Sequence, residues 1–312
     1  MGCEISFIIP CYRSEMTIGP VIDEIVQATA EMAVSTYEII CVVDCSPDNV
    51  YGKLLEIGKK NPNVKAIRFA KNFGQHAGMI AGVQCANGDI CVFLDDDGQC
   101  PMDKLQDLLA PLQNGFDISI AEYGKMKKQS LFKNVGSLFN EIMANLLIDK
   151  PKDIQMGNFM AFKKFVAKEI SRYSGPYPYI SGLLFRTSAK VINVPMEERA
   201  RMQGGTTYTF GKLVALWVSS FTAFSIKPLR FATMIGLGSA VLGGGFAIVT
   251  VVRKLLNPLI AVGWSSVIAL MLIIGGLILF VLGIMGEYLG RIYMSITETP
   301  QYVIAEKYNF DD

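Results

Sequence analysis

Two long apolar runs near the carboxyl end place the strongest constraint on how this chain of 312 residues folds. Residues 231–252 and 265–286 contain no charged side chain. A helix of about 22 residues is roughly 33 Å long, and the hydrocarbon core of a bilayer is about 30 Å thick. Because the core helices of soluble proteins rarely lack every charge over such a length, both runs predict transmembrane helices.

The sequence around the two runs predicts a hairpin. The connection, residues 253–264, is too short to be a domain, so both long ends of the chain should face the same side of the membrane. The basic residues near the spans favour cytoplasmic termini only weakly. Residues 1–10 contain no basic flank or long apolar core, which predicts that no signal peptide is present. We therefore expect a multi-pass protein of the cytoplasmic (inner) membrane, with the amino-terminal domain and both termini in the cytoplasm.

Clustered glycines within the apolar runs, at residues 243–245 and 275–276, favour close helix packing in lipid. Association of several copies through these glycines, as a homo-oligomer, is a hypothesis. The net charge of +1 gives no information about partners, and we expect no nucleic-acid partner.

The first half of the chain alternates predicted strands and helices. The predicted strands are residues 5–9, 37–43, 64–69, 89–94 and 116–121. The predicted helices are residues 17–32, 50–60, 75–86 and 101–113. This alternation predicts an α/β domain with an open, mostly parallel sheet. We expect that domain over residues 1–200, an interfacial segment over 201–230, two transmembrane helices over 231–290 and a cytoplasmic tail over 291–312.

Acidic side chains follow two of the predicted strands, where ligands bind in open α/β sheets. In an extended segment Asp95 and Asp97 would lie on the same side, about 6 to 7 Å apart, with Asp96 facing elsewhere and Gln99 beyond them. Hard oxygen ligands at this spacing suit Mg²⁺ or Mn²⁺ bound to a diphosphate. The alternative is that these acids only cap the next helix. The chain contains no Gly-x-Gly-x-x-Gly or P-loop motif, which argues against a dinucleotide dehydrogenase and a P-loop ATPase.

Several short motifs occur along the chain in a fixed order. They are Pro10-x-Tyr12, Val42-Val43-Asp44-x-Ser46, Asn72-Phe73-Gly74, Asp95-x-Asp97-x-Gln99, Arg199-x-Arg201 and Gly286-Glu287-Tyr288. In this order, and with the two apolar runs, they resemble the blocks of glycosyltransferase family 2 enzymes that charge polyprenyl phosphates. These enzymes include phosphodolichol mannosyltransferases, bactoprenol glucosyltransferases and undecaprenyl-phosphate aminoarabinose transferases. The resemblance covers nearly the whole chain.

The resemblance implies a nucleotide-binding domain of the GT-A type and assigns roles to residues within it. The residues implied to bind the nucleotide-sugar donor are Pro10, Tyr12, Val42, Asp44, Asp95 and Arg201. Asp95, Asp97 and Arg201 would be catalytic, and Asp95, Asp97 and Gln99 would hold the divalent cation. A cation and a guanidinium beside the leaving diphosphate stabilise charge that develops in the transition state.

The implied reaction is transfer of a sugar to the phosphate of a polyprenyl phosphate, such as undecaprenyl phosphate, at the cytoplasmic face of the lipid bilayer, with inversion. The residues expected to hold the acceptor phosphate are Lys125, Lys127, Lys128, Lys133 and Arg199. A phosphate monoester is largely dianionic at pH 7 and already a nucleophile, so no general base is assigned. Asn158 occupies a position that is acidic in some of these enzymes.

Two further segments favour contact with the membrane surface. Residues 131–147 have a helical apolar spacing behind a run of lysines, and an ordinary core helix explains them equally well. Residues 210–224 have a broad apolar stripe that includes Trp217, which favours an interfacial helix. His76, the only histidine, more readily packs or caps a helix than acts in catalysis.

This chain departs from the family pattern in several places. Where the second block usually reads Asp-Asp-Gly-Ser, it has Asp44-Cys45-Ser46, so the second acid is absent and the loop is altered. Arg13 stands where many of these enzymes have Asn. Two alternative functions stay open at this point: transfer to another membrane lipid such as diacylglycerol, and a catalytically inert nucleotide-sugar binder or membrane scaffold.

Overall fold

The computed structural model describes residues 4–124, 154–175, 178–197, 199, 227–256, 263–297 and 300–310. The chain divides into two compact units. The first, called the α/β unit here, comprises Met1–Thr209 and Thr299–Asp312. The second, the helical unit, comprises Phe210–Glu298.

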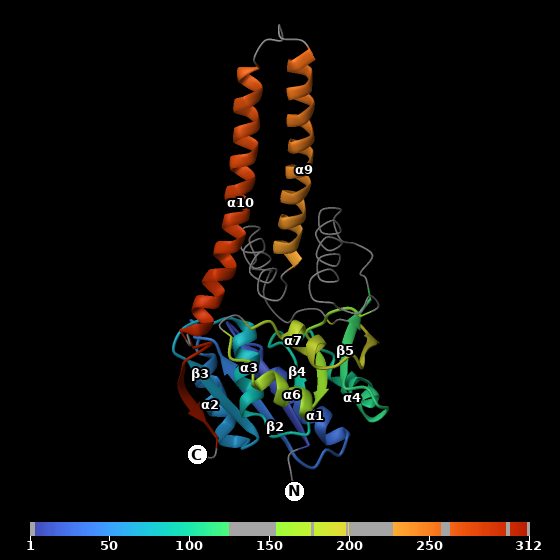
Figure 1. Ribbon diagram of the computed structural model, residues 1–312. Coiled ribbons are helices and arrows are strands. Elements are labelled where there is room, and N and C mark those ends of the chain that lie inside the picture. Colours follow the sequence, from blue (N-terminus) through green and yellow to red (C-terminus); the bar gives the residue numbers. More distant parts are fainter. Residues whose placement is uncertain are drawn as a thin grey trace. The chain divides into compact units, whose positions relative to one another are not determined.

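The α/β unit is built on an eight-stranded sheet with the order β7-β5-β6-β4-β1-β2-β3-β8 (Figure 1). The strands are β1 (Ile5–Cys11), β2 (Tyr37–Val43), β3 (Val64–Phe69), β4 (Ile90–Phe93), β5 (Ile118–Tyr123), β6 (Met160–Lys163), β7 (Val191–Met196) and β8 (Ile304–Tyr308). Strands β4, β1, β2 and β3 are parallel to one another, whereas β6 and β8 run antiparallel to their neighbours. The predicted α/β class with a mostly parallel sheet is confirmed.

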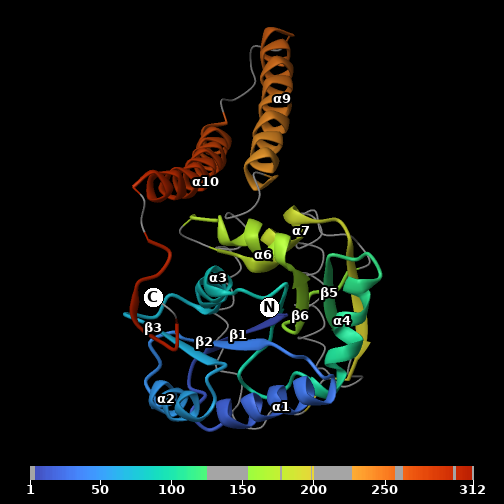
Figure 2. The same cartoon turned by 90° about the horizontal axis from the view of Figure 1, so that it is seen from below.

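Helices cover both faces of this sheet. They are α1 (Ile18–Glu31), α2 (Val50–Lys60), α3 (Gln75–Cys85), the 3₁₀ helix η1 (Met102–Lys104), α4 (Leu105–Gln113), α6 (Lys164–Ser171) and α7 (Ile180–Thr187). Figure 2 shows α1 and α2 on one face, and α3 and α6 on the other. Side chains that alternate along a strand point to opposite faces, so central strands covered on both sides must be apolar at nearly every position. Strand β2 meets this condition, because six of its seven residues are buried.

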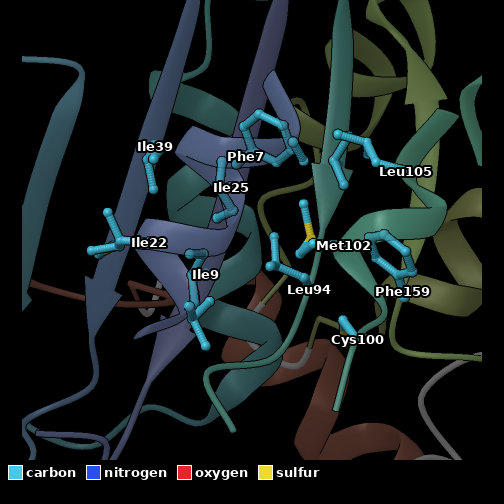
Figure 3. Close-up of a cluster of buried hydrophobic side chains, with 14 of the residues drawn as sticks. Phe7, Ile9, Ile22, Ile25, Ile39, Leu94, Cys100, Met102, Leu105 and Phe159 are labelled. Atoms are coloured by element: carbon cyan, nitrogen blue, oxygen red, sulfur yellow. The ribbon is translucent and has the colours of Figure 1, made fainter. Parts of the chain in front are cut away.

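The larger hydrophobic core lies between the sheet and helices α1, α2 and α4 (Figure 3). Phe7 and Ile9 of β1 and Ile22 and Ile25 of α1 are fully or almost fully buried there. Burying one such side chain stabilises the fold by about 1.5 to 3 kcal/mol. On the other face, α3 approaches the sheet closely, because a Cβ at Gly82 would lie 2.3 Å from Cγ2 of Ile8.

The carboxyl-terminal segment corrects one prediction of domain organisation. We expected residues 291–312 to form a cytoplasmic tail. Instead, α10 extends to Ile296, and β8 joins the edge of the sheet antiparallel to β3, where Figure 1 shows it in red. Arg68 of β3 forms an ion pair with Glu306 of β8. A strand formed after the helical unit therefore completes the sheet of the α/β unit.

The described part of the helical unit contains two long helices, α9 (Lys227–Leu256) and α10 (Trp264–Ile296). Both apolar runs of the sequence are thus helical. Among the described residues, one segment, Ile273–Ile296, is long and apolar enough to cross a membrane, and α9 contains a shorter apolar stretch, Ala232–Gly243. The two-span hairpin therefore stays a prediction. The predicted interfacial helices over 131–147 and 210–224 lie outside the described residues.

Candidate active site

The turns that follow β1, β2 and β4 are joined by hydrogen bonds at the carboxyl edge of the sheet. The backbone N–H of Tyr12 donates to Oδ2 of Asp96 at 2.9 Å. The backbone N–H of Arg13 donates to Oγ of Ser46 at 2.7 Å. Carboxyl ends of parallel strands lie at one edge, where open α/β sheets bind their ligands. The structure thus brings the first, second and fourth sequence motifs together.

Asp95 is held by two side-chain amides. Its Oδ1 accepts a hydrogen bond from Nε2 of Gln75 at 2.8 Å, and its Oδ2 accepts one from Nδ2 of Asn158 at 2.7 Å. Gln75 is the first residue of α3, and Asn158 lies just before β6. Sequence reasoning did not find these partners. Two features of the sequence could have pointed to them: Asn158 stands at a position that is acidic in some of the similar enzymes, and Gln75 directly follows the Asn72-Phe73-Gly74 motif.

The segment after Asp95 differs from the extended geometry that the sequence analysis assumed. Strand β4 ends at Phe93, and Asp96 and Asp97 lie in a turn. That turn continues into Gly98, whose φ of 76° favours glycine. Asp96 binds the backbone amide of Tyr12, whereas Asp95 binds the side-chain amides of Gln75 and Asn158. Burial raises the pKa of Asp96 above its ordinary value, although the Tyr12 amide opposes this shift.

The residues predicted to hold a divalent cation present hard oxygen donors. Oδ1 of Asp97 accepts a hydrogen bond from the backbone N–H of Gln99 at 3.0 Å. The side-chain amide of Gln99 donates to the backbone carbonyl of Arg199 at 3.2 Å. Within the described ranges, no three His, Cys, Asp or Glu side chains gather into a metal site. Two carboxylates are nevertheless the usual protein share for Mg²⁺, which takes its other ligands from substrate phosphates and water. The donor set of Asp95 and Asp97 therefore fits such a cation.

Asp44 anchors the loop that precedes α3. Its Oδ1 accepts the backbone N–H of Phe73 at 2.6 Å, and its Oδ2 accepts that of Gly74 at 2.7 Å. Only 4% of Asp44 is exposed, and this burial raises its pKa despite the two amides, which lower it. The structure therefore places Asp44 as a loop anchor, and its predicted contact with the donor stays a prediction. Cys45, in the loop that departs from the family pattern, adopts a φ of 49°, a region that side chains disfavour.

Two residues that were predicted to contact the donor are buried. Pro10 and Val42 pair in register on β1 and β2, and both lie under Gly78 of α3. Val42 is fully buried, and the contact of Pro10 and Val42 with the donor stays a prediction. By contrast, 46% of Tyr12 is exposed, and the guanidinium of Arg13 lies 5.6 Å from the centre of its ring.

Arg199 is paired with two carboxylates. Nη1 of its guanidinium lies 2.8 Å from Oε2 of Glu24, and Nη2 is paired with Asp103, so the guanidinium joins α1 to η1. Arg199 also borders a cavity of about 640 Å³, which is lined by Asp103, Lys104, Glu122 and Glu197 as well. The predicted role of Arg199 in binding the acceptor phosphate stays a prediction.

The remaining predicted site residues lie outside the described residues. They are Arg201 and the lysines Lys125, Lys127, Lys128 and Lys133. Their roles stay predictions.

His76 packs against the site rather than facing a ligand. Its ring lies 5.3 Å from that of Tyr179, at an interplanar angle of 77°. Its Nδ1 is buried and has no hydrogen-bond partner among the residues that the structure describes. Burial lowers the pKa of His76 to about 4, so the imidazole is neutral near pH 7. A packing role, as the sequence favoured, agrees with this environment.

We expect His76 to make the protein less stable in mild acid. Its pKa is about 4 in the folded chain, against an ordinary value of 6.5, so the unfolded chain takes up the proton first as the pH falls. Stability should therefore be lost between pH 6.5 and pH 4. His76→Phe keeps a ring against Tyr179 and should reduce the fall in Tm between pH 7 and pH 5. An equal fall in Tm for both proteins would contradict this assignment.

Comparison with known proteins gives consistent matches. Residues 6–171 match the family described as "Glycosyl transferase family 2". An uncharacterized glycosyltransferase of Bacillus subtilis, YkcC, is 30% identical over 98% of this chain and 95% of its own length. The undecaprenyl-phosphate 4-deoxy-4-formamido-L-arabinose transferase of Photorhabdus laumondii is 28% identical over 97% of this chain and 94% of its own length.

A solved structure shares the fold. The glucosyl-3-phosphoglycerate synthase of Mycobacterium tuberculosis, in complex with Mn²⁺, UDP-glucose and phosphoglyceric acid, superposes with a TM-score of 0.52. The match has 17% sequence identity and covers 69% of this chain and 76% of the other. At this identity the likeness concerns the fold alone.

Proposed function

Because the chain belongs to glycosyl transferase family 2, we propose that it transfers a sugar from a nucleotide-sugar donor to the phosphate of a polyprenyl phosphate. The chain is a glycosyltransferase with a GT-A-like α/β fold and a mostly parallel sheet. The polyprenyl acceptor, the inverting course, the use of Mg²⁺ or Mn²⁺ and the cytoplasmic membrane face belong to the proposal.

One observation carries the choice of acceptor. The similarity to undecaprenyl-phosphate transferases extends over 97% of this chain, so it includes the apolar helices as well as the family domain. A polyprenyl phosphate joins an anionic headgroup to a hydrocarbon chain. In a protein that has both a nucleotide-sugar domain and apolar helices, the headgroup can meet the domain while the hydrocarbon chain lies beside the helices.

The topology of the sheet supports two crossings of the membrane. Strands β3 and β8 pair in one sheet, yet α9 and α10 lie between them in the sequence. A chain that leaves a folded unit and returns to it crosses a bilayer an even number of times. If Ile273–Ile296 crosses, a second crossing must lie between Phe210 and that segment, and α9 contains the described apolar stretch there. Cytoplasmic placement of both termini is part of the same proposal.

The residues of the candidate site supply the proposed chemistry. Asp95 and Asp97 would hold the divalent cation, which supplies positive charge to the nucleotide diphosphate as it leaves. Gln75 and Asn158 fix the orientation of the Asp95 carboxylate, so it does not reorganise during the reaction. Tyr12 exposes its ring beside this turn, where a donor base can stack. The acceptor phosphate attacks the anomeric carbon, and the nucleotide diphosphate leaves from the opposite face.

The proposal is tested with the full-length protein in lipid nanodiscs. We would supply undecaprenyl phosphate, Mg²⁺ or Mn²⁺ and a panel of labelled nucleotide sugars, and identify the lipid product by mass spectrometry. The expected product is a polyprenyl monophosphate sugar, whose anomeric configuration is opposite to that of the donor. Retained configuration would contradict inversion, and labelled diacylglycerol would favour transfer to another lipid. Donor binding without any product would favour a scaffold.

A further inference from the structure

The segment directly after the helical unit holds a loop of the α/β unit. Nε2 of Gln301 donates to the backbone carbonyl of Tyr173 at 2.9 Å and to that of Gly175 at 2.5 Å. Both carbonyls lie in the connection between α6 and α7. A single side chain thus satisfies two acceptors of this connection, which limits its freedom.

The next residue, Tyr302, acts through Gln84 on the end of α6, directly before this connection. The ring of Tyr302 is stacked on Phe69 of β3, with centroids 5.0 Å apart and an interplanar angle of 14°. Its hydroxyl donates to Oε1 of Gln84 in α3, and Nε2 of Gln84 donates to the carbonyl of Ser171 at 3.0 Å. Ser171 is the last residue of α6. Burial raises the pKa of Tyr302 to about 12, so the hydroxyl keeps the proton that it donates.

The other end of the connection reaches the candidate active site. The ring of Tyr179 packs on His76, which directly follows Gln75. Its hydroxyl donates to Sδ of Met156 at 3.7 Å, two residues before Asn158. Tyr179 therefore contacts a neighbour of each of the two amides that bind Asp95.

We propose that Gln301 and Tyr302 are positioning residues for sugar transfer. They hold residues 171–175, at the start of the connection that leads to Tyr179, and so help to keep the two amide donors in place on Asp95. This inference rests on the proposed function. Gln301 follows Ile296, the end of α10, by five positions.

The sharpest test replaces Gln301 with an isosteric side chain that lacks the donor. Gln301→Glu places a carboxylate against two carbonyl oxygens, which should release the connection. We expect kcat to fall about tenfold or more, as is common when a residue that orients a metal ligand is lost. Hydrogen exchange of peptides covering residues 171–179 should become faster. Tm should change little, because the core of the α/β unit is untouched.

Matched variants separate positioning from general damage. Gln301→Lys restores a donor and should recover part of the lost kcat and of the exchange protection. Glu306→Gln removes the ion pair between β8 and Arg68 without touching the connection, and should leave kcat within twofold of the wild type. Tyr302→Phe keeps the stacked ring but loses the hydrogen bond to Gln84, so it should accelerate exchange and lower kcat even if Gln301→Glu folds poorly.

The outcomes distinguish this inference from the proposed function. A kcat within twofold of the wild type for Gln301→Glu and Tyr302→Phe, or unchanged exchange over residues 171–179, would overturn the positioning role. If the wild type transfers no sugar to a polyprenyl phosphate, the proposed function fails. In that case, two measurements on the variants would still show whether Gln301 and Tyr302 position the site around Asp95. They are hydrogen exchange over residues 171–179 and calorimetry of Mn²⁺-dependent UDP binding.

Discussion

Asp97→Asn should reduce sugar transfer to lipid by at least about 100-fold, because it removes one of the two negative charges proposed to hold the divalent cation. The substitution is nearly isosteric. Its remaining carbonyl oxygen still accepts the hydrogen bond that the Gln99 amide gives to Asp97 at 3.0 Å. We therefore expect the variant to fold normally while its turnover and its Mn²⁺-dependent UDP binding are both lost.

A control for this experiment removes a carboxylate elsewhere in the same unit. Asp107 lies on α4 and is paired with Lys104 at 3.6 Å, with both side chains more than half exposed. Exposed pairs of this kind contribute little, so Asp107→Asn should leave transfer and thermal stability almost unchanged. Wild-type turnover in Asp97→Asn would place the cation, or the whole reaction, at another site.

Gly88→Ala should destabilise the α/β unit by about 3 kcal/mol or more, because the new methyl group meets backbone. A Cβ at Gly88 would lie 2.6 Å from the backbone nitrogen of Ser6 in the central strand β1. The amide of Gly88 donates to Oγ of Ser6, which in turn donates to Glu38. Moving the strands apart would break these buried hydrogen bonds as well. Thermal unfolding of the full chain in detergent should show Tm lowered by about 6 °C or more.

The matched control is another glycine that has open space around it. Gly19 lies in α1, and a Cβ there would meet nothing within 4 Å. Gly19→Ala should leave Tm unchanged or raise it slightly, since alanine is the better helix former. Equal Tm values for Gly88→Ala and Gly19→Ala would show that the backbone around Ser6 shifts to accommodate the new methyl group at little cost, which would contradict this prediction.

The buried charge near Ser6 adds a pH dependence that is distinct from that of His76. Burial alone would raise the pKa of Glu38, but hydrogen bonds from Lys65, Ser6 and the amide of Asn87 outweigh it and hold the pKa below its ordinary value of 4.5. The stability that Glu38 contributes is therefore present above pH 4.5 and is lost as the pH falls through its lowered pKa. Glu38 therefore does not contribute to the change in Tm between pH 7 and pH 5 that is used to test His76.

Local sequence patterns were enough to predict the elements of the α/β unit and the place of its candidate site. Apolar residues that recur every two positions indicate a strand, and those that recur every 3.6 positions indicate a helix. Because these patterns depend only on nearby residues, they predicted β1 to β5 and α1 to α4 close to their observed bounds. The carboxyl edge of a parallel sheet gathers the loops that follow its strands. For that reason the acids after β4 and the turn after β1 were correctly expected at one edge.

Contacts between groups that lie far apart in the chain could be identified only in the folded structure. Strand β8 is five residues long and pairs with β3, more than 230 positions earlier, so no local pattern distinguished it from a tail. Asp44 binds the backbone amides of Phe73 and Gly74, and Arg199 pairs with Glu24 and Asp103; the sequence pattern predicted none of these partners. The physical reason is the same in each case. A polar side chain binds whichever donor or acceptor the fold brings within about 3 Å, and the periodicity of a sequence does not record that partner.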